Sequence, residues 1–283
     1  MMKRHLPEAN TRRPLVIEPQ NGWRVIDIQA LYQYRDLFRF FVWRDIKVLY
    51  KQTVLGFLWA VIRPVLSMII FSIVFGVLAK MPSDNTPYPI FTYAALIPWS
   101  YFSAALTTSA QSLVMNANMI TKVYFPRLVI PLTPVLAGLV DFFISFTVLA
   151  ILMTWYGIAP AAGVVILPGL ILLMMLTAAG MGMWLSALAI QYRDVRHALP
   201  FMTQLLMYAA PVIWPVSLVP ETYRTVYGLY PMAGVIEGFR SVLLGTVSIP
   251  WDLILSGSLS GVIIFLSGAF YFRRTERVFA DVA

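Results

Sequence analysis

The sequence predicts an all-α polytopic membrane protein with six transmembrane helices, an N-terminal amphipathic interface helix, and outside half-helices between spans five and six. Its composition, a series of long apolar runs and the uneven placement of Lys and Arg each favour this class. Of the 283 residues, 59% are hydrophobic and 12% are charged, whereas soluble domains are about a quarter charged. A soluble core of this size cannot enclose so much apolar surface, so lipid must cover the rest. The same composition argues against a nucleic-acid partner.

Residues 1–27 are predicted to form a flexible cytoplasmic arm. This arm contains Lys3, Arg4, Arg12 and Arg13, but no apolar stretch follows them. A cleaved signal peptide needs such a stretch, so we expect none.

Residues 28–54 are predicted to form an amphipathic helix. Apolar side chains such as Phe38 and Phe41 recur at three- and four-residue steps, and Arg44, Lys47 and Lys51 fall on the other side. The helix is too charged to cross a bilayer. It either lies in the cytoplasmic membrane interface with its aromatic side in lipid or packs on the cytoplasmic face of the protein itself.

Residues 55–283 are predicted to form the transmembrane domain. Gly56 ends the amphipathic helix, and six apolar runs follow, each long enough to cross about 30 Å of hydrocarbon at a helical rise of about 1.5 Å per residue. The predicted spans are 57–78, 90–113, 128–156, 163–190, 199–219 and 251–272.

The segment 220–250 is interrupted by glycine and proline and is too broken for a full span. It either forms half-helices that dip into the outer leaflet, buried in protein or lining a cavity, or lies as a helix on the outside surface.

The placement of positive charge predicts the orientation. Eighteen of the 21 Lys and Arg residues fall in the termini and the loops of one side, and only Lys80, Arg224 and Arg240 fall on the other. Loops rich in Lys and Arg stay in the cytoplasm. Both termini are therefore expected in the cytoplasm, in agreement with an even number of spans.

The residues that enzymes and metal sites need are scarce. The sequence has no GxxxxGK[ST] phosphate loop, no cysteine, and only two histidines, His5 and His197, neither of which lies in a predicted span. We therefore expect a transporter rather than an enzyme, with no metal site and no cofactor in this chain.

One acidic residue, Asp141, lies in the middle of the third predicted span. Acids inside a membrane are costly and usually face the bundle interior or water. Asp141 either relays protons or cations, or contacts a polar substrate, or forms a hydrogen bond that packs two helices. No cation lies near it in the same span, which favours the packing role.

An ordered set of short motifs resembles the membrane subunit of ABC-2 type exporters, in particular the permeases that export O-antigen, capsule and wall teichoic acid. The resemblance covers about residues 30–275 and includes none of the first thirty. The matching motifs are Tyr34 to Leu37, Arg44 to Gly56, Leu58 to Pro64, Asn116 to Met119 with Lys122, Phe125 to Arg127 with Pro131, Tyr192 to Val195, Pro211 to Pro215, Tyr230-Pro231, Phe239-Arg240 and Leu243 to Gly245.

This resemblance implies a homodimer in the bacterial inner membrane that works with two copies of a separate ABC ATPase, which holds the ATP and Mg. The substrate implied is a polysaccharide on a lipid anchor. The loop between spans two and three then docks on the ATPase, and the segment after span five forms an outside gate. The residues implied for coupling are Asn116, Asn118, Lys122, Phe125, Pro126 and Arg127, and those implied for the gate are Tyr230, Pro231, Phe239 and Arg240.

If the lipid anchor carries a diphosphate, the entrance of the exporter needs cations next to the membrane lipid to receive it. Arg44, Lys47, Lys51 and Arg63 cluster in sequence at the cytoplasmic start of the first span, on either side of Gly56. Arg63 either receives the diphosphate or reaches a membrane phosphate as an interfacial anchor.

Three other functions stay open at this point. They are an ABC-2 permease for a drug or small lipid, a proton-coupled secondary transporter that uses Asp141, and a membrane enzyme of lipid-carrier metabolism.

Overall fold

The computed structural model describes residues 28–51, 56–120, 122, 125–245 and 247–276. Every regular element within these ranges is a helix. They are α1 (Ile28–Gln33), α2 (Arg35–Lys51), α3 (Leu58–Phe71), the π-helical η1 (Ser72–Leu78), α4 (Tyr88–Met115), α5 (Ala117–Ile120), α6 (Val129–Ala137), α7 (Leu139–Trp155), the 3₁₀ turn η2 (Ala162–Ile166), α8 (Leu167–Gln191), α9 (Asp194–Ala209), the 3₁₀ turn η3 (Val216–Leu218), α10 (Glu221–Gly228), α11 (Pro231–Leu244) and α12 (Trp251–Thr275).

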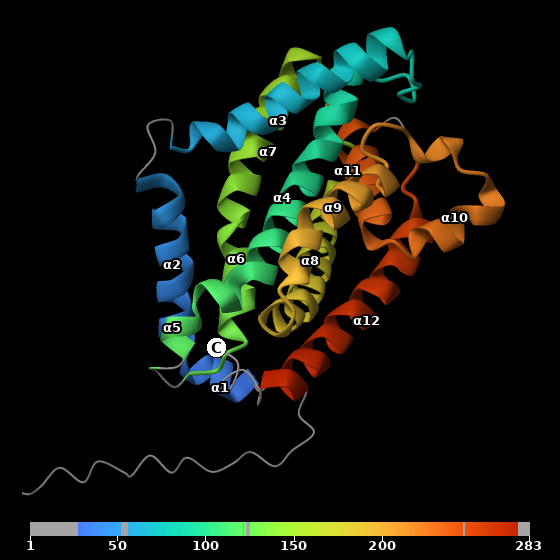
Figure 1. The fold of residues 1–283 in the computed structure, drawn as a ribbon. Coiled ribbons are helices and arrows are strands. Elements are labelled where there is room, and N and C mark those ends of the chain that lie inside the picture. Colours follow the sequence, from blue (N-terminus) through green and yellow to red (C-terminus); the bar gives the residue numbers. More distant parts are fainter. Residues whose placement is uncertain (1–27, 52–55, 121, 123–124, 246, 277–283) are drawn as a thin grey trace, which may run out of the picture.

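Helix α4 forms the centre of the bundle. It packs against α8, α6, α7, α11 and α3, whereas α12 lies along α8 (Figure 1). The largest fully buried side chains include Phe91, Tyr93 and Phe102 of α4 and Phe239 of α11. The core is therefore built around one helix that the rest of the chain surrounds.

Four segments are long and apolar enough to cross a membrane: Leu58–Leu78, Val129–Trp155, Gly163–Gln191 and Trp251–Thr275. These confirm four of the six predicted spans. Within the third span α6 and α7 join at Gly138, four residues after Pro134. The carbonyl of Val135, just before this junction, accepts a 2.7 Å hydrogen bond from the Tyr101 hydroxyl.

The second predicted span, 90–113, is continuous in α4 but is less apolar than those four. Three of its polar side chains, Thr92, Ser109 and Ser112, are buried in protein, whereas Thr108 is exposed. The hydroxyl of Ser109, for example, donates to the carbonyl of Pro131 at 2.7 Å. A helix enclosed by other helices does not need the hydropathy that lipid contact demands.

The fifth predicted span, 199–219, is wrong as a single helix. α9 begins at Asp194 and ends at Ala209, and residues 210–215 are irregular before η3. Pro211 and Pro215 lack backbone N–H donors, and two prolines so close together disfavour continuation of the helix.

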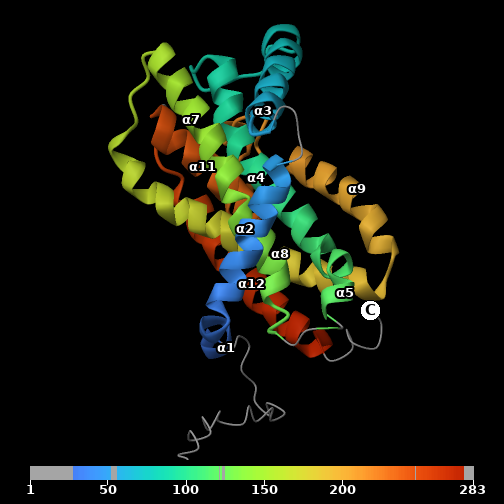
Figure 2. The same ribbon diagram turned by 90° about the vertical axis from the view of Figure 1, so that its left-hand side faces the viewer.

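The predicted amphipathic helix is interrupted at Tyr34, and residues 1–27 and 52–54 lie outside the described residues. α2 lies beside α6 on the face seen in Figure 2. The side of α2 that was expected in lipid packs on protein, with Phe41 buried and Phe38 half-buried. That side of α2 thus packs on protein, but the helix runs along the length of the bundle (Figures 1 and 2) rather than across its predicted cytoplasmic face. Phe40 and Trp43 remain exposed on another side.

The broken segment 220–250 contains two helices with opposite environments. α10 is largely exposed, whereas every residue of α11 is buried. A surface helix therefore describes α10 but is wrong for α11, and the position of both on the outside stays a prediction.

Helices α8 and α12 approach each other very closely at two glycines. A Cβ atom on Gly180 would lie 2.6 Å from the Cα of Phe265, and one on Gly268 would meet the carbonyl oxygen of Gly180 more closely still. Only glycine fits at this crossing.

Candidate functional sites at the two ends of the bundle

One end of the bundle gathers the segments predicted to face the cytoplasm. α1, α5 and the last turn of α12 meet at the bottom of Figure 1. An apolar cluster joins them, in which the rings of Phe41 (α2) and Phe125 pack edge to face at 5.6 Å and Ile120 and Phe272 are buried beside them. The loop between α4 and α6 is therefore fastened to both α2 and α12.

The residues predicted for coupling divide into buried and exposed members. Phe125 is buried and Pro126 is half-buried, so both hold the loop rather than offer a docking surface. Asn116 donates from its side chain to the carbonyl of Ser112 at 2.8 Å, which ends α4.

The exposed part of this loop contains Lys122 and, nearby, Met115. Asn118 lies in the short helix α5. Arg127 donates a hydrogen bond to the backbone carbonyl of Glu276 and so ties the loop to the end of α12. Burial raises the pKa of the Glu276 carboxyl, while Arg127 and Arg273 act in the opposite direction.

The cations predicted for the substrate entrance follow one another along α2. Arg44, Lys47 and Lys51 are spaced so that they share one side of the helix. Arg44 pairs with Asp45 at 2.9 Å and lies over the Phe41 ring, and Lys47 lies over the Trp43 ring at 4.9 Å. The charge of Arg44 is thus already compensated, whereas Lys51 is exposed at the end of α2.

Arg63 lies on α3, which crosses the end of the bundle opposite α1, α5 and the last turn of α12 (Figure 1), so the structure does not bring it to the predicted cytoplasmic end. It is exposed, its guanidinium lies 5.7 Å from the centre of the Trp59 ring, and it has no ion-pair partner within 4.0 Å among the described residues. α3 packs on α4 and α7, whereas α2 packs on α6. Gly56 stands between them with a φ of +43°, which glycine adopts without strain.

Asp141 has a specific partner that the sequence did not predict. The hydroxyl of Tyr50, near the end of α2, donates a hydrogen bond to the Asp141 carboxylate in α7. Burial and this bond raise the pKa of the Tyr50 hydroxyl, so Tyr50 stays a donor. The only sequence signal was the general need of a half-buried acid for a donor. The bond joins the amphipathic helix to the third span.

The residues predicted for the outside gate lie in a buried network. Arg240 is fully buried; it donates to the carbonyls of Val212 at 2.7 Å and Trp214 at 3.3 Å, and to that of Phe91 at 3.2 Å. It also pairs with the buried Glu237 at 3.4 Å. One guanidinium therefore connects α11 to the first turn of α4 and to the break after α9.

Three tyrosines complete this network. Tyr230 donates to the carbonyl of Leu206 at 3.1 Å, Tyr227 to that of Ala209 at 2.8 Å, and Tyr88 to that of Ile213 at 2.7 Å.

The two remaining predicted gate residues have packing roles. Pro231 starts α11, and the Phe239 ring packs edge to face on Phe142 of α7 at 6.0 Å. The carbonyls freed by the broken helix are thus satisfied by side chains, which is the condition for irregular backbone at membrane depth.

The sequence matches one known protein family and several characterised transport proteins. The sequence model of a family described as ABC-2 type transporter matches residues 36–244. The chain is 30% identical to the O-antigen export system permease protein RfbA of Myxococcus xanthus over 217 residues, which cover 76% of this chain and 83% of that protein.

Two further relatives are similar over most of their length. An O-antigen export system permease protein RfbA of Klebsiella pneumoniae is 28% identical over 84% of this chain and 92% of its own length. The polysialic acid transport protein KpsM of Escherichia coli is 22% identical over 82% of this chain and 91% of its own length.

Proposed function

The chain belongs to the ABC-2 type transporter family, and from this membership we propose that it is the permease subunit of an ATP-driven exporter of lipid-linked polysaccharide. The observation that supports this most directly is the similarity to O-antigen and polysialic acid transport proteins over more than three quarters of the chain. The glycan would move from the cytoplasm across the inner membrane, with its lipid anchor remaining in the bilayer.

The energy source in this proposal is a separate ABC ATPase. The sequence contains no phosphate loop of its own. Two copies of the ATPase would bind to a homodimer of this chain through the exposed part of the α4–α6 loop around Lys122. The packing of Phe125 on Phe41 and the bond from Arg127 to Glu276 would pass movement of that loop to α2 and α12.

The membrane topology in this proposal has six crossings. Besides the four apolar segments, α4 crosses as the enclosed central helix, and α9 crosses together with the irregular residues that follow it. Both termini would then be cytoplasmic, and α10 and α11 would lie at the outside end. The charge distribution supports this orientation.

The exposed cations Lys51 and Arg63 would receive the diphosphate. In the single chain α3 lies at the end of the bundle opposite α1 and α5 (Figure 1), so an entrance at the cytoplasmic end requires a different placement of α3 in the assembled exporter. The substrate path ends near α11, whose buried network would control the outside opening. A glycan is too polar to cross lipid, so the path must be wet and must lie between two copies of the chain.

The alternative of a proton-coupled transporter loses support from the Tyr50–Asp141 bond, which gives Asp141 a structural role. A permease for a drug or small lipid stays a second candidate, because membership of the family alone does not select the substrate.

The decisive test is reconstitution of the chain with an ABC ATPase that co-purifies with it. Proteoliposomes containing both subunits should move a lipid-linked glycan in an ATP-dependent manner, measured by its access to an added lectin. The control is the same preparation with an ATPase that lacks its phosphate-loop lysine. ATP hydrolysis by the purified permease alone, or movement of small lipids but not glycans, would contradict the proposal.

A further inference from the structure

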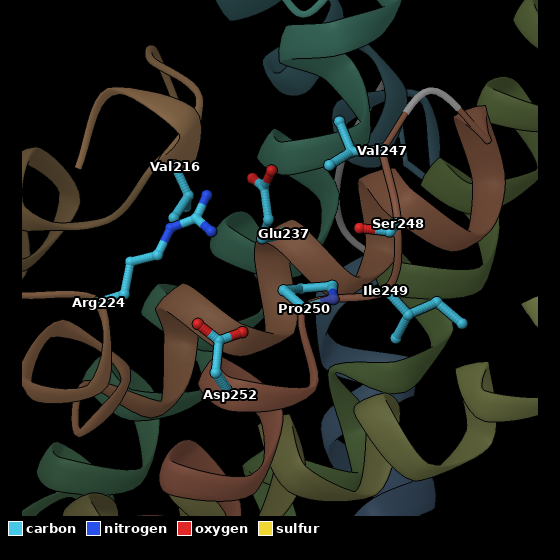
Figure 3. Close-up of a pocket in the computed structure, with 8 residues that line it drawn as sticks. All are labelled: Val216, Arg224, Glu237, Val247, Ser248, Ile249, Pro250 and Asp252. Carbon is cyan, nitrogen blue, oxygen red and sulfur yellow. The ribbon is translucent and has the colours of Figure 1, made fainter. Parts of the chain in front are cut away.

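A small pocket lies where α10, α11 and the start of α12 meet. It has a volume of about 170 Å³ and is lined by polar and apolar side chains, among them Arg224, Glu237, Ser248 and Asp252. That volume equals about five or six water molecules at ~30 Å³ each. Figure 3 shows the guanidinium of Arg224 directed towards Glu237, with the carboxylate of Asp252 on a neighbouring side.

The charged groups of this pocket face one another across open space. Neither Glu237 nor Asp252 lies within 4.0 Å of a nitrogen of Arg224 among the described residues. The Nε atom of Arg224 is buried and has no hydrogen-bond partner there. Glu237 is held by Arg240 at 3.4 Å, so it is not free to approach Arg224. A buried donor without a partner is costly, so an oxygen atom bound in the pocket, whether of water or of a ligand, would stabilise Arg224.

The chemistry of the lining restricts what can bridge these charged groups. Such a group must donate to carboxylates and accept from a guanidinium, and a hydroxyl does both. Besides the lining carboxylates Glu237 and Asp252, Asp84 lies near the pocket, where Ser217 beside Val216 donates to it at 2.9 Å. Three carboxylates against Arg224 and Arg240 make the surroundings of the pocket slightly acidic. An anion would meet both carboxylates, and a cation would meet Arg224. Val216 and Ile249 add an apolar wall. These features fit a neutral ring with several hydroxyls and one apolar face.

We propose that this pocket binds a single neutral sugar unit, and that in the assembled exporter it is an outside contact for the emerging glycan. The second half of this statement rests on the proposed function, because that function puts α10 and the start of α12 at the outside end. The first half depends only on the pocket.

The test uses the full chain with Ser248, which is exposed at the rim, replaced by Cys. The natural sequence has no cysteine, so a maleimide reagent reports on this position alone. Membranes containing Ser248→Cys would be labelled in the presence of glucose, mannose, galactose, rhamnose or N-acetylglucosamine. Betaine, a neutral solute without hydroxyls, controls for general solute effects.

We expect at least one of these sugars, and not betaine, to slow the labelling. Adding Arg224→Gln or Asp252→Asn should weaken this protection by roughly tenfold, the loss expected from one charge-assisted hydrogen bond. Adding Glu221→Gln, which changes an exposed carboxylate of the same helix α10, should leave protection unchanged. If no sugar protects a position that the reagent labels, or if protection survives both pocket substitutions, the proposal is overturned.

Export measured on the same cells separates this proposal from the proposed function. Normal glycan export without sugar protection would overturn the pocket assignment alone. Sugar protection in a native chain that exports no glycan with its ATPase would overturn the proposed function and would leave the pocket as a sugar site.

Discussion

The guanidinium of Arg240 donates a 2.7 Å hydrogen bond to the carbonyl oxygen of Val212. Val212 lies between two prolines in the irregular segment that interrupts the helix after Ala209. The hydrogen-bond donor for this free carbonyl therefore comes from another helix, 28 residues further along the chain. The shape of the break and the position of α11 consequently depend on each other.

Replacing Arg240 with Met should strongly destabilise the protein. The change leaves the Val212 and Trp214 carbonyls without this donor and leaves Glu237 buried without its partner, and breaking such a pair costs about 3–5 kcal/mol. The unfolding temperature in detergent, measured by heating samples and determining the fraction that remains monodisperse by size-exclusion chromatography, should be lower than that of the native chain. The matched control is Arg39→Met on the exposed side of α2, which should change little. Addition of Glu237→Met to Arg240→Met should recover part of the loss, and equal stability of Arg240→Met and the native chain would contradict the role given to this residue.

Asp141→Asn should retain most export, because an amide oxygen still accepts the Tyr50 hydroxyl. Tyr50→Phe removes the donor and should cost about 1.5 kcal/mol, the lower end for a bond to a charged group at a half-buried site. Hydrogen exchange of α2 should rise in Tyr50→Phe and stay near native in Asp141→Asn, with the exposed Tyr32→Phe as the control. Complete loss of export in Asp141→Asn at normal expression would instead favour a proton relay.

Arg63→Lys should weaken export and Arg63→Ala should weaken it more, by roughly ten- to a hundredfold, because only Arg makes bidentate contacts to phosphate. Basal ATP hydrolysis by the assembled complex should persist in both variants. Arg39→Ala, which removes an exposed cation elsewhere on the chain, serves as the control. Native export by Arg63→Ala would make this residue an interfacial anchor only.

Glu276 should make the protein less stable as pH rises. Burial raises the pKa of its carboxyl in the folded state above the ordinary value of 4.5, so the folded state holds the proton more tightly than the unfolded state. Stability attributable to this group therefore falls as pH rises from 4.5 through the raised pKa. Glu276→Gln should remove that decline, seen as a flatter unfolding temperature between mildly acidic and neutral pH. Glu221→Gln, at an exposed site, should keep the native profile, and an unchanged profile in Glu276→Gln would argue against the shift.

Single cysteines at Lys122 and Glu221 should be labelled from opposite sides of the membrane. Both positions are exposed, and no native cysteine competes. An impermeant maleimide added to whole spheroplasts should label Glu221→Cys at once and Lys122→Cys only after lysis. Labelling of Lys122→Cys in intact spheroplasts would reverse the proposed orientation.

The length of the apolar runs was sufficient to predict four spans, because these helices are apolar along most of their length. It was insufficient for α4, whose Thr92 and Ser109 are compatible with the interior only because neighbouring helices surround them. It was also insufficient after Ala209. Pro211 and Pro215 indicated a disturbance there, but the donors that make a full break tolerable come from Tyr88, Tyr227, Tyr230 and Arg240. Such long-range partners have no signature within the segment itself.

The candidate sites, too, could be predicted only in part from the sequence. The coupling loop was identified as a segment, yet only the structure separates its buried anchor Phe125 from its exposed Lys122. Arg44 was predicted as one of the entrance cations, because spacing reports the side of a helix and not ion pairing, and its neighbour Asp45 compensates its charge. Tyr50 was missed because its partner lies 91 residues away.

The glycine crossing of α8 and α12 limits how the molecule can move. If one helix slid along the other, a side chain would collide with the backbone at Gly180 or Gly268, where there is no room for a Cβ atom. In the proposed transport cycle the two helices would therefore keep their register and move as one rigid unit. Backbone hydrogen bonding departs from the α-helix at the π-helical η1 and at residues 210–215. Because Arg240 and the tyrosines hold residues 210–215, a movement of that segment in the proposed exporter would move α11 with it, while α8 and α12 turn as one rigid pair.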